Sequence, residues 1–296
     1  MKFAAIDIGS NAVRLLLARV FEQDDGPFIK KESLVRMPIR LGDDSFLRKT
    51  ISDKKIDQLS KTMLAFNYLI QAYEPLDYVA CATSALRDAS NSTQVITKIT
   101  EYSGIQLKII DGKEEANIIF SNHFEKRLNQ RRTYLYIDVG GGSTELTLFD
   151  KKKMIASQSF NIGTIRLLND IVTKQQWNEL KTWIKTYCTP FKSISAIGSG
   201  GNINKIFRLS ASKENQPMDF ETLSAIYLSL RRYSYEERIY KLGLRPDRSD
   251  VIIPAAKIYH SVMKWSKIKN IYVPQIGLAD GLVHILYNQY RNRSQA

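Results

Sequence analysis

Two segments of the chain repeat one arrangement, an aspartate at the end of an apolar run followed by a turn of small residues. Asp7 precedes the turn Gly9-Ser10-Asn11, and Asp138 precedes the turn Gly140-Gly141-Gly142-Ser143. Because glycine has no Cβ, the backbone amides of such a turn can approach an anion closely. A carboxylate directly before the turn can hold a hard cation such as Mg²⁺. The repeat therefore predicts two phosphate-binding turns, each with a metal-binding aspartate.

An ordinary hairpin turn, or an aspartate that caps a turn, is the alternative interpretation of either segment. It explains one copy well, but it does not explain why an aspartate stands at the same place in both. A third turn, Gly198-Ser199-Gly200-Gly201, and two arginines near the turns, Arg14 and Arg87, extend the predicted phosphate site. A guanidinium group can hold two phosphate oxygens at once, although a surface ion pair would use the same residue type.

Adjacent glutamates, Glu114 and Glu115, follow Asp111-Gly112 where a helix is expected to begin. Hydrolysis of a phosphoanhydride needs a carboxylate that orients or deprotonates the attacking water. Negative charge at a helix start is also favourable by itself, because of the helix dipole. The residues alone favour this structural interpretation over the catalytic one, and Glu145 is a further candidate for positioning metal or water.

Alternating strands and helices are expected to position these groups. Strands are expected at 2–8, 13–20 and 29–37, a long amphipathic helix ends before Pro75, and the order of elements repeats from residue 133. The polar stretch Glu125–Arg132 directly before the repeat is the predicted hinge. Mixed sheets with intervening helices indicate an α/β fold with two domains, 1–124 and 125–296.

The net charge of +13 falls entirely on residues 123–296, since residues 1–122 carry equal numbers of basic and acidic side chains. Such asymmetry favours a polyanionic partner, with Arg166, Lys205 and Arg208 as candidate contacts. No nucleic-acid-binding motif is recognisable, so nucleic acid is not the expected partner. No apolar run is long enough for a membrane span and no signal peptide is recognisable, which predicts a cytoplasmic protein without a membrane partner. Two cysteines without metal-type spacing are expected to be free thiols.

Taken in order, the motifs resemble those of the exopolyphosphatase and guanosine pentaphosphate phosphohydrolase (Ppx/GppA) family of the actin-like superfamily. The resemblance extends from Ile6 to about Gly281. Besides the two aspartate–glycine segments it rests on five motifs: Ala82–Asn91, Asp111–Ala116, Asn161–Leu167, Gly198–Asn202 and Asp250–Ala256.

This resemblance implies two actin-like (ribonuclease H-like) lobes with mixed sheets flanked by helices and a cleft between them, in the short two-domain form of the family. It implies magnesium-dependent removal of terminal phosphate from polyphosphate. Glu115 would be the catalytic glutamate with Glu114 as the near alternative, and Asp138 would be a metal ligand with Asp7 as its counterpart.

Three alternatives stay open at this point: a guanosine pentaphosphate phosphohydrolase, a non-catalytic regulator that binds alarmone or polyphosphate, and a kinase or filament protein of the same fold. Self-association into a homodimer is also left open.

Overall fold

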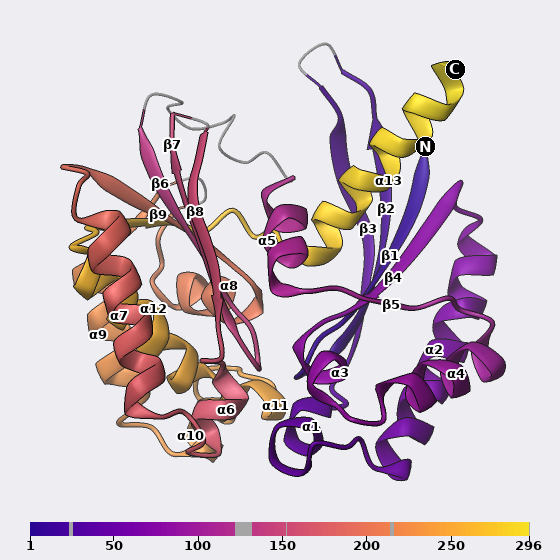
Figure 1. Cartoon of the computed structure of the whole chain (residues 1–296), viewed down its shortest axis with the longest axis horizontal. Helices are drawn as coiled ribbons and strands as arrows, with labels where there is room; N and C mark the ends of the chain where they lie inside the picture. Colours follow the sequence, from indigo (N-terminus) through magenta and orange to yellow (C-terminus); the bar gives the residue numbers. More distant parts are fainter. Residues whose placement is uncertain (24–25, 122–131, 152, 214–215, 296) are drawn as a thin grey trace. The chain divides into compact units, whose positions relative to one another are not determined.

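The computed structural model describes residues 1–296 apart from 24–25, 122–131, 152, 214–215 and 296. The chain forms two compact units, Met1–Asn122 together with Leu278–Ala296, and His123–Gly277. Figure 1 shows the helices and strands of each unit. The predicted hinge at Glu125–Arg132 falls almost entirely outside the described residues.

A five-stranded mixed sheet forms the centre of the first unit. Its strands are β1 (Lys2–Ile8), β2 (Val13–Phe21), β3 (Phe28–Met37), β4 (Asp77–Ala82) and β5 (Lys108–Ile109). They lie in the order β3-β2-β1-β4-β5. The first three strands are antiparallel neighbours, whereas β4 is parallel to β1 and β5 is parallel to β4. This is the expected sheet of a ribonuclease H-like lobe.

Helices cover both faces of this sheet (Figure 1). They are α1 (Leu41–Arg48), α2 (Asp53–Tyr73), α3 (Ser84–Asp88), α4 (Ser92–Ser103), α5 (Gly112–Phe120) and α13 (Leu278–Gln295). Helices α2 and α4 pack against each other on one side, and α5 and α13 pack against each other on the other side. The apolar residues of α2 that recur at helical spacing, from Ile56 to Ile70, are buried, which confirms the predicted amphipathic helix.

The C-terminal helix belongs to the first unit, whereas the predicted boundary 125–296 placed it in the second domain. Leu282 and Val283 of α13 share one core with Phe3 of β1 and Ile118 of α5. Contact with α5 is close, because a Cβ atom added at Gly281 would lie 1.9 Å from the carbonyl oxygen of Ile118. Order along the chain does not reveal which core a terminal helix joins, so the return of α13 to the first unit could not be predicted.

A six-stranded mixed sheet repeats the same plan in the second unit. Its strands are β6 (Thr133–Val139), β7 (Thr144–Asp150), β8 (Lys153–Phe160), β9 (Ile194–Ser199), β10 (Met218–Asp219) and β11 (Asn270–Tyr272). The order is β10-β11-β9-β6-β7-β8. As in the first sheet, the first two hairpins are antiparallel and the next strand, β9, is parallel to the first. The two units therefore share one sheet topology.

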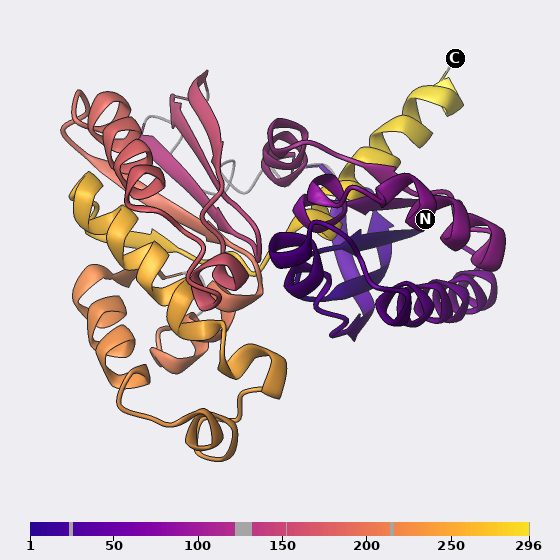
Figure 2. The same cartoon turned by 60° about the horizontal axis from the view of Figure 1, so that its bottom comes forward.

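Seven described helices accompany this second sheet. They are α6 (Thr164–Leu168), α7 (Lys174–Cys188), α8 (Gly201–Leu209), α9 (Phe220–Leu230), α10 (Tyr235–Tyr240), α11 (Pro246–Ser249) and α12 (Ile252–Ser266). Helix α12 packs between α7 and α9, and Figure 2 shows the three side by side. Cys81 and Cys188 are buried free thiols, as predicted. Across the described residues, no helix has both the length and the apolar character needed to cross a bilayer.

Candidate functional site

The turn between β1 and β2 is held in place by contacts with α1 and α3. The Gly9 amide closes the turn by donating to the Ala12 carbonyl at 3.1 Å. The buried Ser10 hydroxyl lies 2.9 Å from the hydroxyl of Ser84, the first residue of α3. The Ser10 carbonyl accepts from the Gly42 amide of α1 at 2.9 Å. The predicted turn Gly9-Ser10-Asn11 is therefore a fixed structure rather than a loose loop.

Asp7 and Arg14 are brought together as direct partners across the β1–β2 hairpin. Nη1 of Arg14 donates to Oδ2 of Asp7 at 2.6 Å. The aspartate side chain is 5% exposed, whereas 30% of the arginine side chain stays accessible. This pairing favours Arg14 as the group that contacts an anion, with Asp7 orienting the guanidinium group of Arg14. A metal-binding role for Asp7 stays a prediction.

The two adjacent glutamates of α5 have different environments. The helix begins after Asp111, whose carboxylate accepts from the Glu114 amide at 2.7 Å. The exposed Glu114 side chain forms an ion pair with Lys108 at 2.6 Å. Glu115 is only 8% exposed. Of these two adjacent residues of α5, Glu114 therefore lies at the surface, whereas Glu115 is buried.

The buried thiol of Cys81 shows which charges lie near Glu115. Burial raises the pKa of Cys81 to about 11, and the negative charge of Glu114 is the next cause. Smaller contributions come from Asp7 and Glu115. Since Cys81 lies beside Asp7 in the register of β1 and β4, these acidic groups occupy one region of the first unit. The thiol stays protonated there and cannot act as a thiolate nucleophile.

Arg87 reaches the segment that leads into α5. Its Nη1 donates to the carbonyl of Ile110 at 2.8 Å, directly before the Asp111 cap. The half-buried guanidinium group thereby fixes the path of the chain ahead of Glu115. This contact is a supporting one, and a direct contact of Arg87 with phosphate stays a prediction.

The second glycine turn repeats the geometry of the first. The Gly140 amide donates to the Ser143 carbonyl at 2.9 Å, as Gly9 does to Ala12. The carbonyls of Gly140 and Gly141 accept from the amides of Thr164 and Ile165, at 3.0 and 2.9 Å. Two backbone amides at the start of α6 thus hold the turn in place.

Arg166 supports this turn from within the protein. It is 7% exposed, and its Nε donates to the Gly142 carbonyl at 2.7 Å. The sequence suggested a contact with a polyanion, but the structure shows a hydrogen bond to the turn itself. The glycine of the motif Asn161–Leu167 has a steric reason, because a Cβ atom at Gly163 would lie 2.3 Å from the Gly141 carbonyl oxygen. Any side chain at this position would displace the turn.

The third turn, at the end of β9, is joined to Asp138. Oγ of Ser199 donates to Oδ1 of Asp138 at 2.6 Å. Gly200 has φ +95° and would place a Cβ atom 3.1 Å from the same oxygen, so both conformation and space require glycine. The fully buried Tyr259 hydroxyl donates to the Ser199 carbonyl at 2.7 Å. Gly201 opens α8, whose first amides point out of the helix start and suit an anion.

Asp138 and Glu145 form a pair of carboxylates on one face of the second sheet. They are direct cross-strand partners on β6 and β7, and carboxylate oxygens of the two residues lie within 4.8 Å of each other. Glu145 also accepts from Oγ of Ser159 at 2.7 Å. Two carboxylates this close repel each other, so a cation or a proton between them is favourable. These hard oxygen donors fit a divalent metal ion of the magnesium type.

Three residues that the sequence did not single out support the turns or the carboxylate pair: Ser84, Ser159 and Tyr259. Ser84 stands inside the recognised motif Ala82–Asn91, so its position was a usable signal. Ser159 carries no local signal, because its role follows from the register that pairs it with Glu145 across β7 and β8. Tyr259 carries none either, because its partner Ser199 lies 60 positions away.

Residues 30–289 match the sequence model of the Ppx/GppA phosphatase family. The chain belongs to this family. Membership in a phosphatase family makes the chain a hydrolase, as the arrangement of turns and carboxylates leads us to expect.

Curated relatives cover most of the chain at low identity. A bifunctional 3-dehydroquinate synthase/phosphatase of Fusobacterium nucleatum is 28% identical over 289 residues, which are 88% of this chain. The chain spans only 43% of that longer protein. Exopolyphosphatase 1 of Mycobacterium tuberculosis is 24% identical over 310 residues, with 96% of this chain and 87% of the relative covered.

Solved structures share the fold over nearly the whole chain. An exopolyphosphatase from Cytophaga hutchinsonii superimposes with a TM-score of 0.82 at 20% identity, covering 98% of both chains. The Ppx/GppA family member from Aquifex aeolicus gives 0.77 at 19% identity, again covering 98% of both chains. These similarities show the two-lobed actin-like fold of the Ppx/GppA structures.

Proposed function

We propose that the chain removes terminal phosphate from inorganic polyphosphate and releases orthophosphate, with Mg²⁺ as its metal. The repeated turn carries this proposal, because Gly9 and Gly140 close two turns of one design, each behind a strand whose last three residues are Ile, Asp and an apolar residue. Relatives named as exopolyphosphatases support the choice of substrate.

In this reaction Glu115 accepts the proton of the attacking water or orients it toward the terminal phosphorus. A buried carboxylate suits this role better than Glu114, which is already engaged with Lys108 at the surface. The bond between the terminal phosphorus and its bridging oxygen breaks, and that oxygen leaves with the shortened polyphosphate. Backbone amides of the glycine turns stabilise the negative charge that develops on the phosphoryl oxygens, and fixed turns do this without rearranging.

Asp138 and Glu145 are the residues that would hold the metal, with Ser199 and Ser159 orienting one carboxylate each. When bound, Mg²⁺ supplies positive charge that neutralises phosphate oxygens and polarises the bond to be cleaved. Tyr259 keeps the Ser199 carbonyl in place from the core. Burial and the charge of Asp138 hold the pKa of this tyrosine well above its usual value, so its hydroxyl stays a donor.

Positive charge near the third turn favours a long polyanion over a compact nucleotide. Burial lowers the pKa of Lys205, and the charges of Arg208 and Arg248 lower it further. Lys205 donates to the Leu242 carbonyl at 2.9 Å and Arg208 to the side chain of Gln275 at 3.1 Å, both of them neutral oxygens. A phosphate chain along α8 would relieve the repulsion among these cations.

Neutralising Lys205 and Arg208 together, as Lys205→Gln with Arg208→Gln, is expected to raise the KM for long polyphosphate by about three- to tenfold, the size expected for two partly exposed charge contacts. The KM for short chains should change less, because a short chain does not reach both side chains. Steady-state rates of orthophosphate release from long and short polyphosphate at several salt concentrations measure this, and the double variant should also show a weaker salt dependence.

The matched control removes the same charge from exposed lysines of α7 in the same unit, as Lys174→Gln with Lys185→Gln. It should leave the difference between long and short chains unchanged. If the two double variants behave alike, or if both chain lengths respond equally, the basic surface does not guide polyphosphate. Guanosine pentaphosphate would then be the better-supported substrate.

A further inference from the structure

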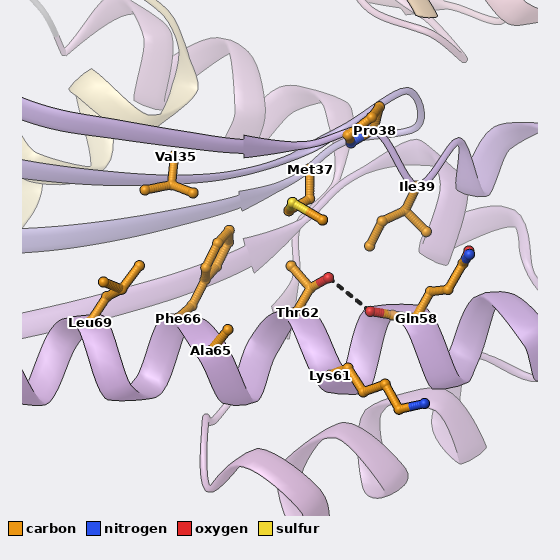
Figure 3. Close-up of a pocket in the computed structure, with 10 residues that line it drawn as sticks. All are labelled: Val35, Met37, Pro38, Ile39, Gln58, Lys61, Thr62, Ala65, Phe66 and Leu69. Carbon is orange, nitrogen blue, oxygen red and sulfur yellow. Dashed lines mark hydrogen bonds between the residues drawn. The ribbon is translucent and has the colours of Figure 1, made fainter.

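A groove of about 430 Å³ lies on the first unit between the edge strand β3 and helix α2 (Figure 3). One wall is formed by Val35, Met37 and Ile39, and the other by Ala65, Phe66 and Leu69. Its volume is within the range of small-molecule sites, about 300–1,000 Å³, and such sites are mostly apolar. None of its lining residues belongs to the aspartate and glycine turns described above.

Large apolar side chains stay exposed at this groove instead of closing over it. Met37 is 43% exposed and Leu69 is 40% exposed, whereas Phe66 beneath them is 1% exposed. Among the described residues no strand pairs with the outer edge of β3. An apolar surface that is both concave and exposed is typical of a binding site rather than of a packed core.

Polar groups gather at one end of the groove, on the turn of α2 that precedes Ala65. They are Gln58, Lys61 and Thr62. The Thr62 hydroxyl is satisfied by the backbone carbonyl of Gln58 at 2.8 Å, as Figure 3 shows. Gln58 and Lys61 are therefore the side chains at this end that can still donate to a ligand, although Figure 3 draws the Lys61 nitrogen turned away from the apolar side chains, and no lining residue is acidic.

Lys61 can turn to a ligand at small cost. Its ammonium group pairs with Asp57 at 2.8 Å, and the two side chains are 64% and 55% exposed. A solvated ion pair one helical turn apart contributes little to stability. The groove thus combines an apolar floor with a lysine at its rim, Lys61, whose existing ion pair with Asp57 is weak.

We propose that this groove binds a small amphipathic molecule with an apolar chain and one anionic head, of the medium-chain carboxylate class. The chain packs on Phe66 between Met37 and Leu69, and the carboxylate lies at the rim formed by Gln58 and Lys61. This site is separate from the proposed phosphatase chemistry and does not depend on it.

Calorimetric titration of the full chain with decanoate, and with decanol as the uncharged match, tests the proposal. One decanoate should bind per chain, about three- to fivefold more tightly than decanol, as expected for one exposed charge pair. Ala65→Trp places a ring in the groove from an exposed helix position and should weaken decanoate binding at least about tenfold. The control Ala72→Trp changes an exposed alanine of the same helix outside the groove and should bind like the parent chain.

Lys61→Gln should abolish the preference for decanoate over decanol, whereas Lys54→Gln on the same helix should keep it. Absence of decanoate binding, or equal binding by the two tryptophan variants, would overturn the proposal. If Lys61→Gln still binds decanoate more tightly than decanol, the proposed recognition of an anionic head by Lys61 is wrong. If circular dichroism shows that Ala65→Trp is unfolded, Leu69→Trp is used in its place. It fills the same groove from another exposed position.

Discussion

Replacing Glu115 by glutamine is expected to lower the turnover number for polyphosphate by about 10²- to 10⁴-fold, the range typical for loss of a general base. Glutamine keeps the size and shape of the buried side chain but cannot accept a proton. The variant should therefore fold and bind polyphosphate like the parent chain. Orthophosphate release measures the turnover number, while thermal unfolding and a binding titration check the other two properties.

Glu114→Gln is the matched control, because it removes the same charge one residue away. Glu114 is exposed and its ion pair with Lys108 contributes little, so this variant should keep nearly normal turnover. The opposite pattern, an inactive Glu114→Gln and an active Glu115→Gln, would show that the base is the neighbouring glutamate. Normal turnover in both variants would place the base outside α5.

Asp138→Asn is expected to raise the magnesium concentration for half-maximal activity by at least about tenfold, because a neutral amide is a weaker ligand for a hard cation. Ser199 can still donate to the amide oxygen, so the β9 turn should keep its position. The measurement is activity against Mg²⁺ concentration, accompanied by calorimetric titration of the metal.

Glu179→Gln serves as its control, since Glu179 is an exposed carboxylate on α7 of the same unit. Its magnesium dependence should match that of the parent chain. An unchanged magnesium requirement in Asp138→Asn would remove Asp138 from the metal site. Full activity of the parent chain in EDTA would remove the metal from the reaction.

Much of the fold could be predicted because its signals are local. The strand predicted at 2–8 is β1 to the residue, and the strand predicted at 13–20 differs from β2 only at its last residue. Helix α1 was missed for a physical reason. It starts after Arg40 in a left-handed conformation, without a side-chain cap, and the Ser10 carbonyl bound by the Gly42 amide helps to hold its start in place. Such a start depends on tertiary contacts that no local pattern records.

The site was predictable to a similar extent. The turns were visible as runs of glycine, and the first hairpin explains why Asp7 meets Arg14. Partners that lie far apart in the sequence were not visible. Arg166 looked like a substrate contact until the fold placed it against Gly142, and Tyr259 reaches Ser199 across 60 positions. Motifs therefore identify which segments matter, whereas the register of strands and helices decides what each side chain does.

Orthophosphate release from polyphosphate, guanosine pentaphosphate and ATP, measured side by side with and without EDTA, tests the proposed activity most directly. We expect polyphosphate to give the highest kcat/KM, orthophosphate to be its released product, and EDTA to abolish the release. Hydrolysis of guanosine pentaphosphate in preference to polyphosphate would contradict the proposed substrate. Release from ATP alone, or from none of the three in the presence of Mg²⁺, would contradict a polyphosphate phosphatase altogether.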